Sequence, residues 1–148
     1  MKKLMLMLVV VACASTYTLG QTASGKRRVV KTGPANGIFS PAIITGDLVY
    51  TSGQIGVDAK TGQLVEGGFE AQLEQVFKNL AVVLDASGSS IEHVVKATVF
   101  LADMNDYNTL NEFYKKQFKG DPPARTTVQV ARLPRDAKVE IEVVAVVK

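Results

Sequence analysis

The clearest pattern in the chain is an apolar stripe at helical spacing between residues 69 and 84. Seven large apolar residues fall at i, i+4, i+7, i+8, i+11, i+14 and i+15: Phe69, Leu73, Val76, Phe77, Leu80, Val83 and Leu84. This spacing places them on one face of an α-helix. Gly88 follows as a C-terminal stop, so the pattern predicts an amphipathic helix packed against a core.

A second helix is predicted over residues 105–118. Its apolar face is formed by Leu110, Phe113, Tyr114 and Phe118. Pro122 and Pro123 end it, because proline lacks the N–H that a helix interior requires. The β-branched run 94–101 lies between the two helices and predicts a strand.

Four further segments have the composition of β-strands: residues 29–31, 47–51, 125–133 and 138–147. Turns are predicted at residues 33–37, 58–62 and 134–137. The predicted order is strand, strand, helix, strand, helix, strand, strand. With both helices on one face of a mixed sheet, the chain is expected to form an α+β sandwich. Its 148 residues suit a single domain.

Alternation along the last two strands assigns their side chains to two faces of the sheet. We expect one face to meet the helices through Val128, Val130, Val139, Ile141, Val143 and Ala145. The other face would carry Arg125, Thr127, Gln129, Glu140, Glu142 and Val144. A strand surface exposed to water would show the same alternation, so the pattern alone does not identify a site.

Arg125 and Glu140 are the candidates for chemistry on this second face. Arginine is suited to bidentate capture of a carboxylate, and the prolines before Arg125 stiffen its backbone. Glu140 can act as a general base toward water. Ser52 and Gly53 follow a predicted strand, and their backbone N–H groups can hold a substrate oxygen; an ordinary strand end is the simpler interpretation.

A simple hairpin about residues 134–137 would place Arg125 opposite residue 144 or 145. Glu140 would then be offset by four or five residues, roughly 13–17 Å at about 3.3 Å per residue. Either strand twist and a bound water bridge this gap, or an adjacent subunit completes the site. We expect the adjacent subunit to contribute, with Val144 and Val99 near an oligomer interface.

Composition argues against several other kinds of site. The only cysteine is Cys13, and no group of His, Cys or Asp has metal-ligand spacing. Gly67 and Gly68 stand alone, so no glycine-rich phosphate loop is present. The one histidine, His93, fits no catalytic triad and is interpreted as a surface residue at a turn. Catalysis is therefore expected to need neither a metal nor a cofactor.

The first twenty residues have the order of a secretory signal peptide. Lys2 and Lys3 precede an apolar run over residues 4–14, which is too short to span a membrane. We expect cleavage after Gly20 and export to the periplasm or the medium. The alternative is a lipid anchor on Cys13, because the three residues before it resemble a lipobox.

Removal of this segment would leave a linker at residues 21–28 and a domain at residues 29–148. Two lysines would be lost, so Lys+Arg falls from 17 to 15 against 14 Asp+Glu, and the net charge falls from +3 to +1. A nearly neutral domain gives no support to a nucleic-acid partner.

Several blocks of the sequence together resemble the RidA (YjgF) family. They are residues 51–55 (TSGQI), 94–101 (VVKATVFL), 103–106 (DMND), 122–134 (PPARTTVQVARLP) and 139–142 (VEIE). The blocks stand in the family's order and the resemblance covers nearly all of residues 29–148. Such a set is more specific than any single motif.

The resemblance implies a chorismate-mutase-like α+β fold that assembles as a homotrimer with sites between subunits. It also implies 2-iminobutanoate/2-iminopropanoate deaminase activity, which hydrolyses reactive imines and enamines to 2-keto acids and ammonia. Arg125 matches the family's carboxylate-binding arginine, and Glu140 matches the glutamate that positions the attacking water. Ser52, Gly53 and Asn111 match positions that contact the substrate.

The chain departs from the family at two pocket positions. Residues 37–42 (GIFSPA) stand where the family usually has GPYSQA, so Phe39 keeps the aromatic ring and lacks the tyrosine hydroxyl. Thr127 stands where many members carry cysteine, which should leave hydrolysis possible. A second hypothesis is therefore an exported trimer that binds keto acids or related small carboxylates without turnover. Ligand binding without rate enhancement would distinguish it from a deaminase.

Overall fold

The computed structural model describes residues 26–32 and 37–148. The predicted signal peptide, Cys13 and most of the predicted linker lie outside these ranges, as do residues 33–36 of the first predicted turn. Cleavage after Gly20 and export therefore stay predictions from sequence. Within the described ranges, no helix has the length and apolar character needed to cross a membrane.

The described residues form seven strands, two α-helices and three short 3₁₀ turns. The strands are β1 (Arg28–Val30), β2 (Ala42–Thr45), β3 (Leu48–Thr51), β4 (Gln54–Ile55), β5 (Val94–Leu101), β6 (Ala124–Gln129) and β7 (Val139–Val146). The helices are α1 (Gly68–Ala86) and α2 (Tyr107–Gln117), and the 3₁₀ turns are Ile91–His93, Met104–Asp106 and Pro134–Asp136. Every strand and helix predicted from the sequence is present in the predicted order, and β2 and β4 are additional.

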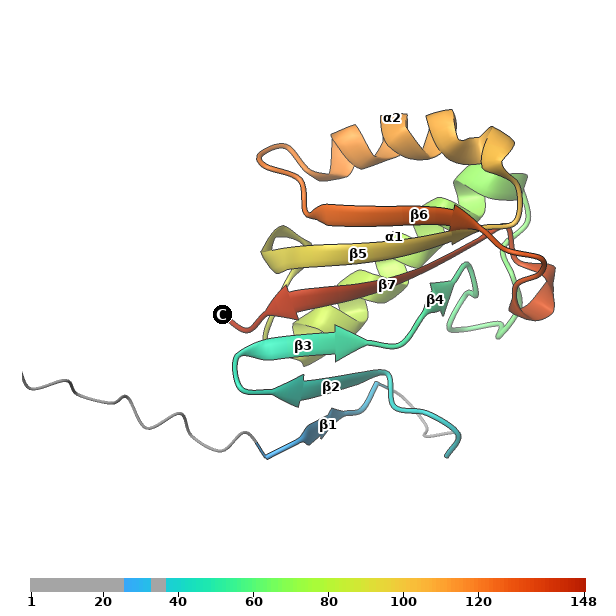
Figure 1. Cartoon of the computed structure of the whole chain (residues 1–148). Helices are drawn as coiled ribbons and strands as arrows, with labels where there is room; N and C mark the ends of the chain where they lie inside the picture. The colour runs from blue at the N-terminus through green and yellow to red at the C-terminus, as the bar shows by residue number, and fades with distance from the viewer. Residues whose placement is uncertain (1–25, 33–36) are drawn as a thin grey trace, which may run out of the picture.

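The seven strands join one mixed sheet in the order β1-β2-β3-β7-β5-β6, with β4 also paired to β7. β5 and β6 run parallel, while the other neighbouring strands run antiparallel. Figure 1 shows α1 crossing one side of the sheet and α2 lying along the β6 edge. The predicted fold class, a mixed sheet with two helices, is confirmed.

The core lies between α1 and the sheet. All seven residues of the predicted apolar stripe on α1 are buried. From the sheet, Val99 on β5 and Ile141 on β7 lie side by side in register and are 0% and 1% exposed. α2 adds Leu110 and Tyr114 to the same core. Burial of each large apolar side chain contributes about 1.5–3 kcal/mol, so the packing of α1 on the sheet is the main source of stability.

The last two strands do not form the simple hairpin considered from the sequence. β5 lies between β6 and β7, pairing in parallel with β6 and antiparallel with β7. The physical reason is the crossover through α2, which returns the chain beside β5 in parallel and so places β6 at the edge of the sheet. In this register Arg125 lies beside Ala97, and Ala97 lies beside Val143.

The register also corrects the assignment of faces. Arg125 and Thr127 share the face of the fully buried residues Ala97 and Val99, so their side chains point toward the helices. Val128, which was predicted to meet the helices, lies on the opposite face and is 40% exposed. Val99 is therefore a core residue and not part of an exposed interface. On β7 the prediction is confirmed, because its four predicted core residues are all buried.

Candidate functional site

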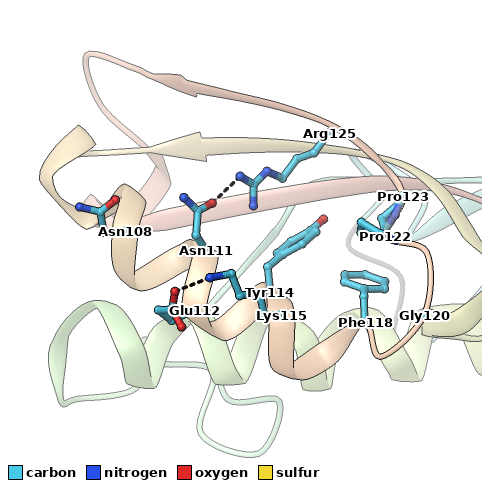
Figure 2. Close-up of a pocket in the computed structure, with 10 residues that line it drawn as sticks. All are labelled: Asn108, Asn111, Glu112, Tyr114, Lys115, Phe118, Gly120, Pro122, Pro123 and Arg125. Carbon is cyan, nitrogen blue, oxygen red and sulfur yellow. Dashed lines mark hydrogen bonds and ion pairs between the residues drawn. The ribbon is translucent and has the colours of Figure 1, made fainter.

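The first candidate site surrounds Arg125 beneath α2. We name it the arginine cluster and define it as Arg125, Asn111, Tyr107 and Tyr114. Nη2 of Arg125 donates to Asn111 Oδ1 at 2.5 Å and lies 3.5 Å from Tyr107 Oη. The guanidinium carbon lies 4.7 Å from the ring centroid of Tyr114 and 5.5 Å from that of Tyr107. Figure 2 shows the guanidinium reaching toward Asn111 on α2. Two aromatic rings and one amide therefore fix the position of the cation.

In the described part of the chain, Arg125 has no acidic partner. Among the residues that the structure describes, side-chain ion pairs join only Lys115 to Glu112 and Arg132 to Asp136. Arg125 is half-buried, and an arginine side chain is always charged. A partly buried cation without a counter-charge suits an anionic ligand, and the planar guanidinium favours a carboxylate.

A cavity of about 720 Å³ adjoins the arginine cluster. It lies between α2 and the segment that leads into β6 (Figure 2). Its lining includes Arg125, Asn111, Tyr114, Phe118, Pro122 and Pro123. The lining also carries the Lys115–Glu112 ion pair, so Arg125 is its one charged group without an ion-pair partner among the described residues. A guanidinium beside aromatic and proline walls offers space for a small carboxylate that carries an apolar group.

Tyr114 connects the arginine to the core. Its side chain is buried, and its ring centroid lies 4.8 Å from that of Phe118 and 5.9 Å from that of Phe77. Burial raises the pKa of Tyr114 to about 12, against the smaller lowering effect of Arg125. The phenol therefore stays uncharged at neutral pH and does not neutralise the guanidinium.

Thr127 lies two residues beyond Arg125 on the same face of β6. Its Oγ1 is buried and has no hydrogen-bond partner among the described residues. A buried hydroxyl without a partner costs about 1–3 kcal/mol. A hydrogen-bonding group brought in by a ligand or a second subunit would remove that cost.

The second candidate site lies on the face of the sheet that the helices leave open. We name it the glutamate cluster and define it as Glu140, Gly53 and Ser52. β4 pairs with β7 and places Ile55 beside Glu140 and Gln54 beside Ile141. Gly53 lies so close to the Glu140 side chain that an added Cβ would overlap Glu140 Oε1. A residue without a side chain is therefore required for the observed position of the carboxylate.

Helix α1 holds the β4 segment in place. Asn79 Nδ2 donates to the carbonyl oxygen of Ile55 at 3.0 Å and to that of Val57 at 2.9 Å. The side chain of Gln72 accepts a hydrogen bond from Lys138 N at 2.8 Å, next to the start of β7. Two polar residues of α1 thus fix both strands that carry the glutamate cluster.

The environment of Glu140 makes its carboxyl group more basic. Burial is the larger cause that raises its pKa, and the negative charge of Glu142 is the second. Both effects disfavour the ionised form. A carboxylate with a raised pKa is a better acceptor for a proton of water.

Within the glutamate cluster, Ser52 is bonded to the segment that follows Phe39. Ser52 Oγ donates to the carbonyl oxygen of Ser40 at 2.7 Å, and Ser52 N donates to that of Pro41 at 2.9 Å. Of the two backbone N–H groups that the sequence offered for a substrate oxygen, that of Ser52 is therefore already bonded. Phe39 precedes this contact, and its side chain is 59% exposed.

The arginine cluster and the glutamate cluster do not meet within one chain. Arg125 faces the helices, whereas Glu140 faces the open side of the sheet. One strand and a register offset of three residues also separate them, which puts their Cα atoms about 14 Å apart. The prediction that they share a face is wrong, because the polar side of the edge strand β6 is the side that α2 covers.

Tyr107 was missed as a site residue, and Tyr114 was predicted only as part of the apolar face. Together with Asn111 they fall at i, i+4 and i+7 along α2. That spacing places all three on one helix face and is the sequence signal that could have found them.

His93 ends a 3₁₀ turn, as interpreted, and its Nδ1 lies 2.8 Å from Ser90 Oγ. No three His, Cys, Asp or Glu residues gather into a metal-binding group in the described ranges.

Comparisons with known proteins add independent information. A family model described as endoribonuclease L-PSP matches residues 28–147. The human protein named 2-iminobutanoate/2-iminopropanoate deaminase is 47% identical over 123 residues, covering 81% of this chain and 90% of that protein. The crystal structure of RidA from an Antarctic Psychrobacter has a TM-score of 0.77 at 42% identity, covering 82% of this chain and 100% of that one. The crystal structure of E. coli TdcF with bound serine has a TM-score of 0.74 at 36% identity, covering 82% of this chain and 99% of that one.

Proposed function

Because this chain belongs to the RidA (YjgF) family, we propose that it is a deaminase that hydrolyses 2-imino acids to 2-keto acids and ammonia. The name of the human relative supports this reaction class. The serine bound to E. coli TdcF supports a small ligand that carries a carboxylate.

The observation that carries the proposal is the unpaired guanidinium of Arg125. It is held by Asn111 and two tyrosine rings, has no ion-pair partner among the described residues, and adjoins a cavity. In the proposed reaction Arg125 binds the substrate carboxylate and fixes the neighbouring C=N carbon. Such positioning can supply much of the acceleration.

Glu140 is proposed to activate water. As the water oxygen bonds to the C=N carbon, the carboxylate of Glu140 takes one proton and then delivers it to the nitrogen. The resulting carbinolamine then gives its hydroxyl proton to the nitrogen through the same carboxylate, and ammonia leaves as the C–N bond breaks and the C=O bond forms. One imine and one water thus give one keto acid and one ammonia, without an oxidant or a reductant.

A neighbouring copy of the chain is proposed to complete the site. Within one chain Arg125 and Glu140 face opposite sides of the sheet, so one chain alone lacks the pair. In a homotrimer, the glutamate cluster of one subunit would lie against the arginine cluster of the next, giving equivalent sites at each interface.

The test generates 2-iminopropanoate from alanine with an amino-acid oxidase and traps it with semicarbazide. The wild-type protein is expected to suppress the trapped product, and Arg125→Ala to lose about 100-fold in this activity because the substrate is no longer positioned. Arg132→Ala, which removes an exposed arginine paired with Asp136, serves as the matched control and should retain activity.

Equal suppression by wild type and Arg125→Ala would refute the proposed role of the arginine. No suppression by wild type, together with measurable keto acid binding, would instead support a carboxylate-binding protein without turnover.

A further inference from the structure

The guanidinium of Arg125 lies between two tyrosines in different environments. Tyr114 is 6% exposed and belongs to the core, whereas Tyr107 is 38% exposed at the first residue of α2. Only Tyr107 has a hydroxyl within hydrogen-bonding reach of the guanidinium, at 3.5 Å from Nη2. Tyr107 is thus the exposed polar neighbour of the proposed carboxylate-binding arginine.

One edge of the Arg125 guanidinium is only weakly hydrogen-bonded through Nη2. A guanidinium binds a carboxylate through two parallel N–H groups along an edge, and Nη2 belongs to both of its bidentate edges. One Nη2 hydrogen is committed to Asn111 Oδ1 at 2.5 Å. The contact to Tyr107 is at the outer limit of a hydrogen bond and is therefore weak. A carboxylate that replaced the contact between Nη2 and Tyr107 would therefore cost little hydrogen-bond energy.

We propose that the Tyr107 hydroxyl is a second donor to the substrate carboxylate, acting beside Arg125. Two donor atoms 3.5 Å apart can both reach one carboxylate at ordinary hydrogen-bond lengths. The carboxylate accepts one bond from Arg125 and one from Tyr107 Oη, while the Tyr107 ring keeps its contact with the guanidinium.

This inference rests on the proposed function for the identity of the ligand. It adds Tyr107 as a residue that donates a hydrogen bond to the carboxylate of that ligand. It also separates the two tyrosines. Tyr114 positions the guanidinium through its ring, whereas Tyr107 contacts the ligand through its hydroxyl. Removal of the Tyr107 hydroxyl should weaken carboxylate binding while the chemical step at the C=N carbon is retained.

The experiment measures the dissociation constants of 2-ketobutanoate and its uncharged methyl ester by calorimetry. Tyr107→Phe keeps the ring and removes the hydroxyl. We expect it to raise the Kd of 2-ketobutanoate about 10-fold, as for loss of a hydrogen bond to a charged group, with the Kd of the ester changed less than about twofold. In imine hydrolysis the same variant should raise KM and leave kcat within about twofold.

Arg132→Ala is again the control, because it changes an exposed residue outside both clusters, and both of its dissociation constants should equal those of wild type. An unchanged Kd of 2-ketobutanoate in Tyr107→Phe would overturn the inference, even where wild type hydrolyses imines and the proposed function stands. Equal binding of the acid and its ester by wild type, or no binding of either, would overturn the inference as well. Arg125 and Tyr107 would then not recognise a carboxylate.

Discussion

Single residues decide where the reactive groups of this protein lie. Gly53 is the clearest case, because the Glu140 carboxylate occupies the space that a side chain at position 53 would need. Glu140 is also affected by its neighbour Glu142 on the same face of β7, whose charge contributes to its raised pKa. These two contacts control the position and the basicity of the proposed base, and each can be tested by one substitution.

Gly53→Ala should impair catalysis far more than stability. The added Cβ would displace the flexible end of the Glu140 side chain without moving backbone, and a shift of about 1 Å in a reacting group can cost about 100-fold in rate. We expect imine hydrolysis to fall by about this factor, with the urea midpoint nearly unchanged.

Gly46→Ala provides the matched control. Gly46 has φ +56 in the β2–β3 turn, with open space where the Cβ would go, so the substitution should cost about 1 kcal/mol of stability and leave activity intact. Normal hydrolysis by Gly53→Ala would show that the position of the Glu140 carboxylate is not critical.

Glu142→Gln should shift the pH dependence of activity toward acid. A general base works in its ionised form, so kcat/KM falls as pH drops through the pKa of Glu140. Removal of the Glu142 charge lowers that pKa, while burial, the larger cause, still raises it. The acid midpoint of the pH–rate profile should therefore move to lower pH.

Asp85→Asn is the control for this shift. Asp85 lies in the last turn of α1 and is not among the groups that influence the pKa of Glu140. Its profile should match wild type. A midpoint that stays in place in Glu142→Gln, or moves toward base, would contradict the role of Glu140 as the titrating base.

At the scale of elements, the end of β3 is fixed to β7 by a side chain. Thr51 Oγ1 accepts a hydrogen bond from Val143 N at 2.9 Å and donates to Val143 O at 3.4 Å, and Thr51 is buried. Ser52 and Gly53 follow directly. The bonds of Thr51 therefore support the segment in which Gly53 lies against the Glu140 side chain.

Thr51→Val should lower the free energy of unfolding by about 1–3 kcal/mol, because it leaves buried polar groups of Val143 without this partner. Urea unfolding monitored by circular dichroism would measure the change. Thr45→Val, at the exposed end of β2, should change stability by less than about 0.5 kcal/mol. Equal effects of the two substitutions would show that the bonds of Thr51 do not stabilise the sheet.

Periodicity predicted the elements well and their pairing poorly. The stripe from Phe69 to Leu84 defined α1, because burial against one face leaves a 3.6-residue repeat in the sequence. β2 and β4 have four and two residues, too few to show alternation. Pairing between distant strands leaves no local repeat, so the position of β5 between β6 and β7 was not predicted.

The same limit applied to the candidate site. Arg125, Glu140 and Gly53 were identified from residue type and family resemblance, and the contact between Gly53 and Glu140 was not foreseen. The faces of Arg125 and Thr127 were misassigned, because α2 covers polar residues of β6 rather than its valine. A helix that packs over an edge strand changes which side is buried, and the alternation of a single strand does not reveal this.

At the scale of the whole molecule, each chain carries the arginine cluster and the glutamate cluster on opposite sides of one sheet. The open face also exposes apolar side chains, with Tyr50 at 45% and Val128 at 40%. A second copy that covered this face would bury apolar area. It could also bring its own glutamate cluster against the arginine cluster of its neighbour. The proposed homotrimer thus accounts for both features.

The most direct measurement is activity in mixed oligomers of Arg125→Ala and Glu140→Gln subunits, co-expressed with different tags and purified through both. Each variant alone should be nearly inactive. If every site takes Arg125 from one subunit and Glu140 from the next, each mixed trimer that carries both tags has one intact site in three, and the mixture should recover about a third of wild-type imine hydrolysis. A mixture no more active than the separate variants would contradict a site shared between subunits.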